Sequence, residues 1–347
     1  MLIYDLFGGA GGAATGISEL GHEVLSFERW EPACESLKAN GHEYVQCDLF
    51  DLNWEHWETP DLLWASPPCQ PFSAGGKQLG HEDERDGMPA LKLAISSLRP
   101  KTLIMENVKG LTSKVNSWYL ADFTAFLTSL GYEYDWKVLN SADFGVPQTR
   151  ERVFVIAKQQ ECAECAALDV LPGGCYGSAH IQWPTQTHFR EIGLFGDNKW
   201  VSMADALGWD ENGRVGFPRK DDTGRSPDGY RERDWFPTTE PAPMVTSKAR
   251  SWWLDRPATT VSGDARIWAP GHKVNASDVE SGRTLRTRAG YTDRKGTTAV
   301  RVTVEEAAKL QDFPDDYVFC GLRTQQFQQI GNAVPCRMAR LLVEANL

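Results

Sequence analysis

The sequence lacks any apolar run long enough to cross a bilayer, and it lacks a basic segment followed by an apolar one after Met1. Strand-forming residues follow Met1 directly instead. The eight cysteines are mostly scattered, so the sequence does not indicate the disulfide framework of a small secreted protein. We therefore expect a cytoplasmic protein with reduced thiols and no membrane attachment.

Basic residues are also in short supply, because the formal net charge of the 347 residues is −11. This deficit is uneven. Residues 214–301 contain 17 Lys and Arg against 11 Asp and Glu, so this stretch carries +6 and the rest of the chain −17. A basic module within an acidic chain indicates a surface that meets a polyanion. An ordinary solvated face with ion pairs would show the same counts.

Helical periodicity is scarce in one long stretch of the chain. Up to residue 158, apolar strand patterns alternate with helical ones, which predicts a mostly parallel sheet with helices on both faces. Between 159 and 300, Pro, Gly, Trp and Arg are frequent, which favours a second domain of short strands and long loops. Regular structure resumes at 301, where Thr303 and Glu306 have the spacing of a helix capping box.

Prolines surround one of the scattered cysteines. Pro67, Pro68 and Pro71 restrict the backbone around Cys69. The apolar residues 61–64 before them indicate a strand, so the thiol would lie at the carboxyl end of that strand, where open α/β sheets hold ligands. A packed cysteine in a turn is the alternative, since a free Cys is often a small buried hydrophobe.

A glycine-rich turn, residues 8–12, follows a first strand and precedes a helix predicted over 13–20. Such a turn lets the backbone approach a ligand, and the helix N-terminus favours a carboxylate or phosphate. Glu28 ends the second strand about 20 residues on, where an acid can take the hydroxyls of a ribose. Asp48 ends the third strand, where it could receive an adenine amino group. Ordinary loop acids would show the same spacing.

Glu106 and Asn107 end the strand that we expect beside the strand of Cys69, so a carboxylate and a thiol would meet in one crevice. A carboxyl group in a buried crevice can hold a proton at neutral pH and donate it. Arg150 and Arg152 alternate at the start of a later strand and therefore face one side, which suits a carbonyl oxygen plus a phosphate. A solvated loop acid and a basic strand edge are the alternatives.

Six motifs in this order resemble those of the bacterial and phage DNA (cytosine-5)-methyltransferases. They are Asp5-Leu6-Phe7-Gly8-Gly9-Ala10-Gly11-Gly12, Pro67-Pro68-Cys69-Gln70-Pro71-Phe72-Ser73, Glu106-Asn107-Val108, Gln148-Thr149-Arg150-Glu151-Arg152, Leu310-Gln311-Asp312-Phe313-Pro314 and Gly331-Asn332-Ala333-Val334-Pro335. The resemblance implies a Rossmann-like class I S-adenosylmethionine-dependent methyltransferase domain, formed by 1–158 and 301–347. A mostly β and loop target-recognition domain, 159–300, would interrupt it.

The resemblance also implies a reaction. A methyl group would pass from S-adenosylmethionine to C5 of a flipped-out cytosine in double-stranded DNA, through a covalent adduct of Cys69 with C6. Glu106 would contact N3 and the amino group, Arg152 would hold O2, and Arg150 would hold the loop or a phosphate. The implied cofactor-binding residues are Asp5, Phe7, Gly8, Gly9, Gly11, Gly12, Glu28, Asp48, Pro67, Asn332 and Val334, and the implied DNA-binding residues are Gln70, Ser73, Arg250 and Arg266.

We expect a monomer in a bacterial or phage-infected cell. The sequence leaves open whether a cognate restriction endonuclease is its partner. The tRNA-methylating branch of the same fold is disfavoured by the length of the recognition segment, 159–300. A DNA-binding regulator with a dead active site is disfavoured because Cys69, Glu106, Arg150 and Arg152 are all present. The spacings of Cys162, Cys165, Cys175 and His180 could bind zinc, but a second Cys-x-x-Cys pair is missing and we predict no metal.

Overall fold

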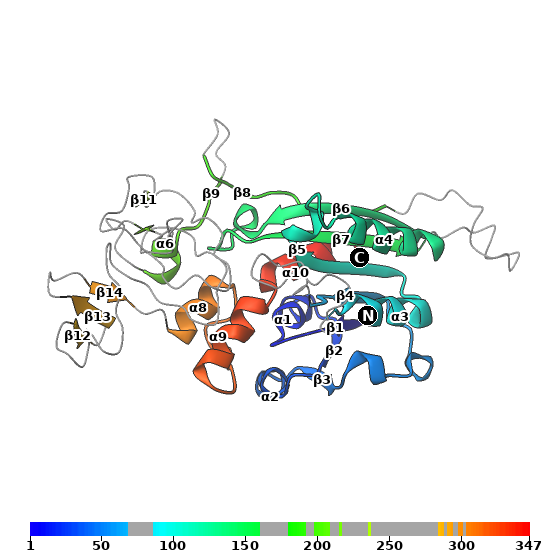
Figure 1. Ribbon diagram of the computed structural model, residues 1–347, viewed down its shortest axis with the longest axis horizontal. Helices are drawn as coiled ribbons and strands as arrows, with labels where there is room; N and C mark the ends of the chain where they lie inside the picture. Colours follow the sequence, from blue (N-terminus) through cyan, green and yellow to red (C-terminus); the bar gives the residue numbers. More distant parts are fainter. Residues whose placement is uncertain are drawn as a thin grey trace, which may run out of the picture.

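The computed structural model describes residues 1–68, 86–159, 180–191, 198–208 and 303–347, together with the backbone of five short strands between 215 and 300. The main strands are β1 (Leu2–Leu6), β2 (Glu23–Glu28), β3 (Glu43–Gln46), β4 (Leu62–Ala65), β5 (Thr102–Val108), β6 (Tyr132–Asn140) and β7 (Glu151–Gln159). They form one sheet in the order β3-β2-β1-β4-β5-β7-β6 (Figure 1). The first five strands are parallel, and β7 is antiparallel to both β5 and β6.

Helices cover both faces of this sheet. The main helices are α1 (Gly12–Ser18), α2 (Glu31–Ala39), α3 (Met88–Leu98), α4 (Ser117–Ser129), α8 (Val304–Leu310), α9 (Arg323–Asn332) and α10 (Cys336–Glu344), of which α8 and α9 lie beside the sheet and not on its faces (Figure 1). The 3-10 turns are η1 (Leu49–Asp51), η2 (Trp54–His56), η5 (Lys109–Thr112) and η6 (Ser141–Phe144). In β5, Leu103 and Met105 join the core that contains α3 and α4, whereas Ile104 joins the core that contains α1 and α10. A strand buried on both faces explains why this stretch is apolar without alternation.

A close helix–helix contact joins elements near the two ends of the chain. α1 packs on α10, and a Cβ atom at Gly16 would overlap the backbone carbonyl of Cys336. α10 begins at Cys336, directly after Pro335. Pro335 has an extended ψ of 133°, and a residue that precedes proline is disfavoured in the helical region.

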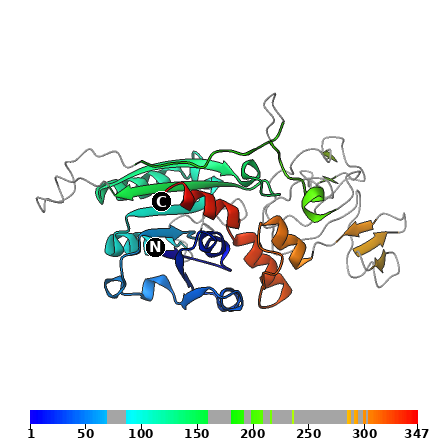
Figure 2. The ribbon, with the colours of Figure 1, turned by 180° about the vertical axis from the view of Figure 1, so that it is seen from behind.

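The segment after residue 303 returns to the sheet. The predicted capping box at the start of α8 is confirmed, because the Thr303 hydroxyl accepts from the Glu306 amide and the Glu306 carboxylate accepts from the Thr303 amide. In both views, α8 and α9 lie between the main sheet and the small strands β12 (Thr284–Thr287), β13 (Gly290–Asp293) and β14 (Thr298–Val300) (Figures 1 and 2). The other short elements are β8 (His188–Phe189), β9 (Asn198–Lys199), α6 (Met203–Leu207), β10 (Val215–Gly216) and β11 (Trp235–Phe236).

Two described parts of the stretch 159–300 contact the main sheet and its connections. The indole nitrogen of Trp183 donates to Asp135 on β6 over 2.8 Å, and that of Trp200 donates to Asp143 in η6 over 3.0 Å. The limits of the recognition domain stay a prediction. Among the described residues, no helix is long and apolar enough to span a membrane.

Candidate active site

The carboxyl ends of β1, β2, β4 and β5 share one edge of the sheet because these strands are parallel neighbours in register. The glycine turn follows β1, Glu28 ends β2, Pro67 follows β4, and Glu106 lies near the end of β5. Residues predicted from separate motifs therefore meet at the edge where open α/β sheets bind ligands.

The glycine turn has a left-handed backbone at several positions. Gly9 and Gly11 have φ values of 53° and 83°, and Phe7 has a φ of 60° although it carries a side chain. A Cβ atom at Gly8 would lie 2.9 Å from the Asp5 carboxylate, whereas a Cβ atom at Gly9 would meet no atom of the described residues within 4 Å. The turn is thus closed on the side of the sheet and open at Gly9, which lets a ligand approach its backbone.

Asp5 lies beneath this turn and is 1% exposed. Ser26 donates to its Oδ2 atom over 3.3 Å, and its Oδ1 atom is buried without a hydrogen-bond partner among the described residues. Burial, followed by the nearby Glu28 charge, raises the pKa of Asp5 to about 7, while the Ser26 hydrogen bond opposes the rise. An unsatisfied buried carboxylate oxygen is costly by itself and fits a site that receives a ligand with a donor group.

Glu28 and Asp48 both shape the loops that they end. Glu28 accepts from the amides of Gly9, Arg29 and Trp30 over 2.7–2.9 Å. Asp48 accepts from the Phe50 amide and forms an ion pair of 3.3 Å with Arg29. These contacts place both carboxylates at the same sheet edge as the glycine turn.

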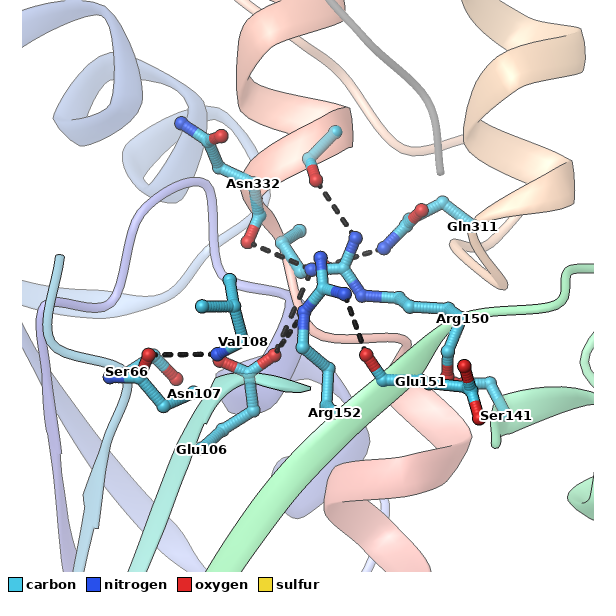
Figure 3. Close-up of polar contacts among 12 residues, drawn as sticks. Ser66, Glu106, Asn107, Val108, Ser141, Arg150, Glu151, Arg152, Gln311 and Asn332 are labelled. Carbon is cyan, nitrogen blue, oxygen red and sulfur yellow. Dashed lines mark hydrogen bonds and ion pairs between the residues drawn. The ribbon is translucent and has the colours of Figure 1, made fainter. Parts of the chain in front are cut away.

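Glu106 is 7% exposed and faces two guanidinium groups (Figure 3). Its Oε1 atom lies 3.0 Å from Nε of Arg152 and 3.8 Å from Nη2 of Arg150. The antiparallel register of β5 and β7, which opposes Val108 to Arg152, brings these side chains together. Both arginines therefore face one side, as strand alternation predicts.

Asn107 connects β5 to the proline segment that precedes Cys69. Its Nδ2 atom donates to the Pro67 carbonyl oxygen over 3.3 Å, and its Oδ1 atom accepts from the Val108 amide. The side chain is 3% exposed, so solvent does not compete for these hydrogen bonds. The backbone two residues before Cys69 is thus fixed to the strand that carries Glu106.

Arg150 contacts the C-terminal segment rather than solvent. It is 2% exposed and donates to the carbonyl oxygens of Gly331 and Asn332 over 2.9 and 3.4 Å. Burial and the neighbouring Arg152 lower the pKa of Arg150 to about 9, while Glu106 opposes that effect. The side chain of Asn332 is exposed, and Val334 is buried against α1.

Three residues without a predicted role, two of them inside the motifs, hold this arrangement. The amide of Gln148 donates to Gln311 over 2.6 Å and to the Leu310 carbonyl, and Gln311 donates to the Ala333 carbonyl over 2.5 Å. At the glycine turn, Tyr317 donates to the Ala10 carbonyl over 2.5 Å. These partners are separated by 22 to 307 residues, so no local pattern reveals them. Their only signal is a position inside or beside a motif.

Some predicted residues lie outside the described part of the chain. They are Cys69, Gln70, Ser73, Arg250 and Arg266, and also Cys162, Cys165 and Cys175 of the zinc alternative. His180 is described and exposed, and its carbonyl accepts from Lys158. Within the described ranges, no three metal-binding side chains cluster.

The family model of the C-5 cytosine-specific DNA methylases matches residues 1–197 and 221–346 of this chain. Type II methyltransferase M1.HphI of Haemophilus parahaemolyticus is 31% identical over 358 residues, which cover 99% of this chain and 86% of that protein. Type II methyltransferase M.AplI of Arthrospira platensis is 29% identical over 349 residues, which cover 99% of this chain and 85% of that protein.

Solved structures show the same fold at lower identity. The crystal structure of Spodoptera frugiperda DNMT2, in a mutant form, has a TM-score of 0.58 and 18% identity, and the match covers 99% of each chain. The expected Rossmann-like methyltransferase fold is confirmed. With the family model covering most of the sequence, the chain belongs to the C-5 cytosine-specific DNA methylases, enzymes that methylate cytosine at C5 in DNA.

Proposed function

We propose that this enzyme transfers a methyl group from S-adenosylmethionine to C5 of a flipped-out cytosine in double-stranded DNA, within a short specific sequence, through a covalent adduct of Cys69 with C6. One observation carries the proposal. Glu106, with Arg152 at 3.0 Å, lies at the same sheet edge as the glycine turn, and Asn107 ties that strand to the segment before Cys69.

S-adenosylmethionine fits the glycine turn and its acids. The unsatisfied Oδ1 of Asp5 can accept from an ammonium group, and the open face at Gly9 gives access to the backbone. Glu28 would take the ribose and Asp48 the adenine, with Phe7, Pro67, Asn332 and Val334 around them. When bound, this cofactor would supply the methyl group.

The chain's own residues would activate the base. The thiolate of Cys69 forms a bond to C6, and the electron pair of the C5–C6 double bond makes C5 nucleophilic. Glu106 would hold a proton at N3 while negative charge develops on the ring, and Arg152 would hold O2. After methylation a base removes the C5 proton, and the returning electron pair breaks the bond from Cys69 to C6.

The stretch 159–300 would recognise the target sequence. Residues 214–301 carry a net charge of +6, which fits contacts with phosphates. Within this basic stretch, Arg250 and Arg266 are candidates for base contacts. Relatives of this chain are named Type II methyltransferases, so we propose a role in restriction-modification or as an unpaired modification enzyme. We propose that it acts as a monomer in the cytoplasm.

The decisive experiment measures transfer from S-adenosylmethionine with a labelled methyl group to DNA and to tRNA. We expect labelled DNA, no labelled tRNA, and loss of labelling in Cys69→Ser. Cys320→Ser, at a half-buried cysteine before α9, is the matched control and should keep full activity. Labelling of tRNA without labelling of DNA would show that the substrate is tRNA and not DNA. DNA labelling that survives in Cys69→Ser would exclude the covalent mechanism. Bisulfite sequencing of DNA from expressing cells then identifies the target sequence.

A further inference from the structure

The guanidinium group of Arg150 touches two parts of the enzyme that belong to different ligands. On one side, Nη2 lies 3.8 Å from the Glu106 carboxylate. On the other side, Nη1 and Nη2 donate to the carbonyls of Gly331 and Asn332. Figure 3 shows the group between Glu106 and the Asn332 backbone. One planar fork therefore contacts the carboxylate proposed for the base and the C-terminal end of α9, which leads into the segment 331–334.

The segment that follows α9 packs directly on Gly12 at the end of the glycine turn. Gly331 and Asn332 lead to Val334, and a Cβ atom at Gly12 would overlap the Val334 carbonyl oxygen. The Ala333 side chain lies against the same position, because that Cβ atom would be 3.1 Å away from it. Packing this tight transmits a displacement instead of absorbing it. A shift of the segment 331–334 would thus be felt both at Gly12 and at Arg150.

The burial of Arg150 makes its contacts interdependent. A buried guanidinium ion is stable only while its carbonyl and carboxylate partners stay in place, since loss of one partner leaves a charge with an uncompensated desolvation cost. Its backbone is fixed as well, because the Arg150 amide donates to Asn140 and the Arg150 carbonyl accepts from Ser141. A shift of either the segment 331–334 or Glu106 therefore changes how firmly Arg150 holds the other of the two.

We infer that Arg150 is a positioning residue that couples the cofactor site to the base site, so that S-adenosylmethionine and DNA each bind more tightly when the other is present. This inference rests on the proposed function. Coupling between two sites is reciprocal and typically amounts to about 5–150-fold in affinity. Arg150 acts through Glu106 and the segment 331–334 and contacts neither ligand in this scheme.

The test compares the affinity for S-adenosylhomocysteine, the demethylated cofactor, with and without a duplex that contains the mapped target sequence. In the unmodified enzyme we expect this ligand to bind at least about fivefold more tightly with DNA. In Arg150→Met the ratio should fall to near one. Arg150→Lys, which keeps the charge but loses the planar fork, should lower the ratio as well and serves if Arg150→Met does not fold.

Arg337→Met is the matched control. Arg337 also joins the C-terminal segment to the β6–β7 connection, by donating to the Gly145 carbonyl and pairing with Asp312 at 3.2 Å, but it has no contact with Glu106 among those observed. This variant should lose thermal stability and keep the affinity ratio. An unchanged ratio in the Arg150 variants, or an equal loss in Arg337→Met, would overturn the inference. Unmodified enzyme that methylates DNA but shows a ratio of one refutes the coupling alone, whereas enzyme that methylates nothing refutes the proposed function.

Discussion

Asn107 and Pro67 are joined by a hydrogen bond of 3.3 Å between the ends of β5 and β4. The bond connects the proposed base-binding strand to the segment that carries Cys69, although the two residues are 40 positions apart. Asn107 is the donor, and the carbonyl of Pro67, which has no N–H group of its own, is the acceptor.

Asn107→Ala should therefore reduce turnover more than folding. The variant loses two side-chain hydrogen bonds, to the Pro67 carbonyl and from the Val108 amide, each worth about 0.5–1.5 kcal/mol of stability. A displacement of about 1 Å at a reacting group can cost roughly 100-fold in rate. We expect kcat to fall by about 10- to 100-fold, with the KM for the cofactor little changed. Steady-state kinetics and urea unfolding measure the two effects. The control Asn116→Ala removes an amide that donates to Gly110 away from Pro67, and it should spare kcat. Equal kcat values for Asn107→Ala and the unmodified enzyme would contradict the assignment.

Asp5 should make stability depend on pH. Its pKa rises from 3.8 to about 7 in the fold, so the folded chain binds more protons than the unfolded chain between these values. Ionising Asp5 thus destabilises the fold as the pH rises, and the loss is complete above about pH 7. Asp5→Asn removes this charge and should be more stable than the unmodified protein at pH 8, by an upper bound of roughly 4 kcal/mol. At pH 4 the gain should vanish. Urea unfolding at both pH values is the measurement, and an equal difference at pH 4 and pH 8 would contradict the prediction.

Cofactor binding should show the opposite trend with pH at the same residue. An ionised Asp5 attracts an ammonium group, so the affinity for S-adenosylhomocysteine should fall as the pH drops below about 7. Ser26→Ala removes the hydrogen bond that opposes the pKa rise and should shift the midpoint of this profile to higher pH. Calorimetric titrations between pH 5 and 9 record the profile. A profile that is identical in Asp5→Asn would show that another group titrates.

Gln311→Glu should lower the free energy of unfolding, because Gln311 links the C-terminal segment to Gln148. Gln311 is fully buried, and its amide nitrogen donates to Ala333 while its oxygen accepts from Gln148. A carboxylate at this position cannot donate and would place a negative charge against the Ala333 carbonyl, which costs about 2–4 kcal/mol. Gln328→Glu on the exposed side of α9 is the matched control and should change stability by less than about 0.5 kcal/mol. Equal unfolding midpoints for both variants would mean that the buried amide pair is dispensable.

Gly16→Ala should separate α1 from α10. The added methyl group would overlap the Cys336 carbonyl, which is backbone and cannot move away as a flexible side chain can. Overpacking of this kind costs about 1–3 kcal/mol or more, and the displaced α10 should also weaken cofactor binding through Val334 and Gly12. Ser18→Ala, on the exposed end of α1, should be neutral or slightly stabilising. Thermal unfolding distinguishes the two, and a Gly16→Ala variant as stable as Ser18→Ala would refute the close packing.

The sequence by itself determined the local elements and the composition of the site. Apolar runs predicted β4 and β5, the spacing of Thr303 and Glu306 predicted the cap of α8, and strand alternation predicted that Arg150 and Arg152 face one side. These features depend on residues a few positions apart, whose geometry the backbone fixes.

The tertiary structure decided which side chains complete the site. The burial of Arg150 beneath Gly331 and Asn332, the pairing of Gln148 with Gln311, and the contact of Gly16 with Cys336 join residues that are 163 or more positions apart or lie on separate helices. Such contacts depend on how layers pack around the core, and no periodicity in the sequence records them. The same packing makes Asp5 an unsatisfied buried acid and Arg150 a bridge between two sites.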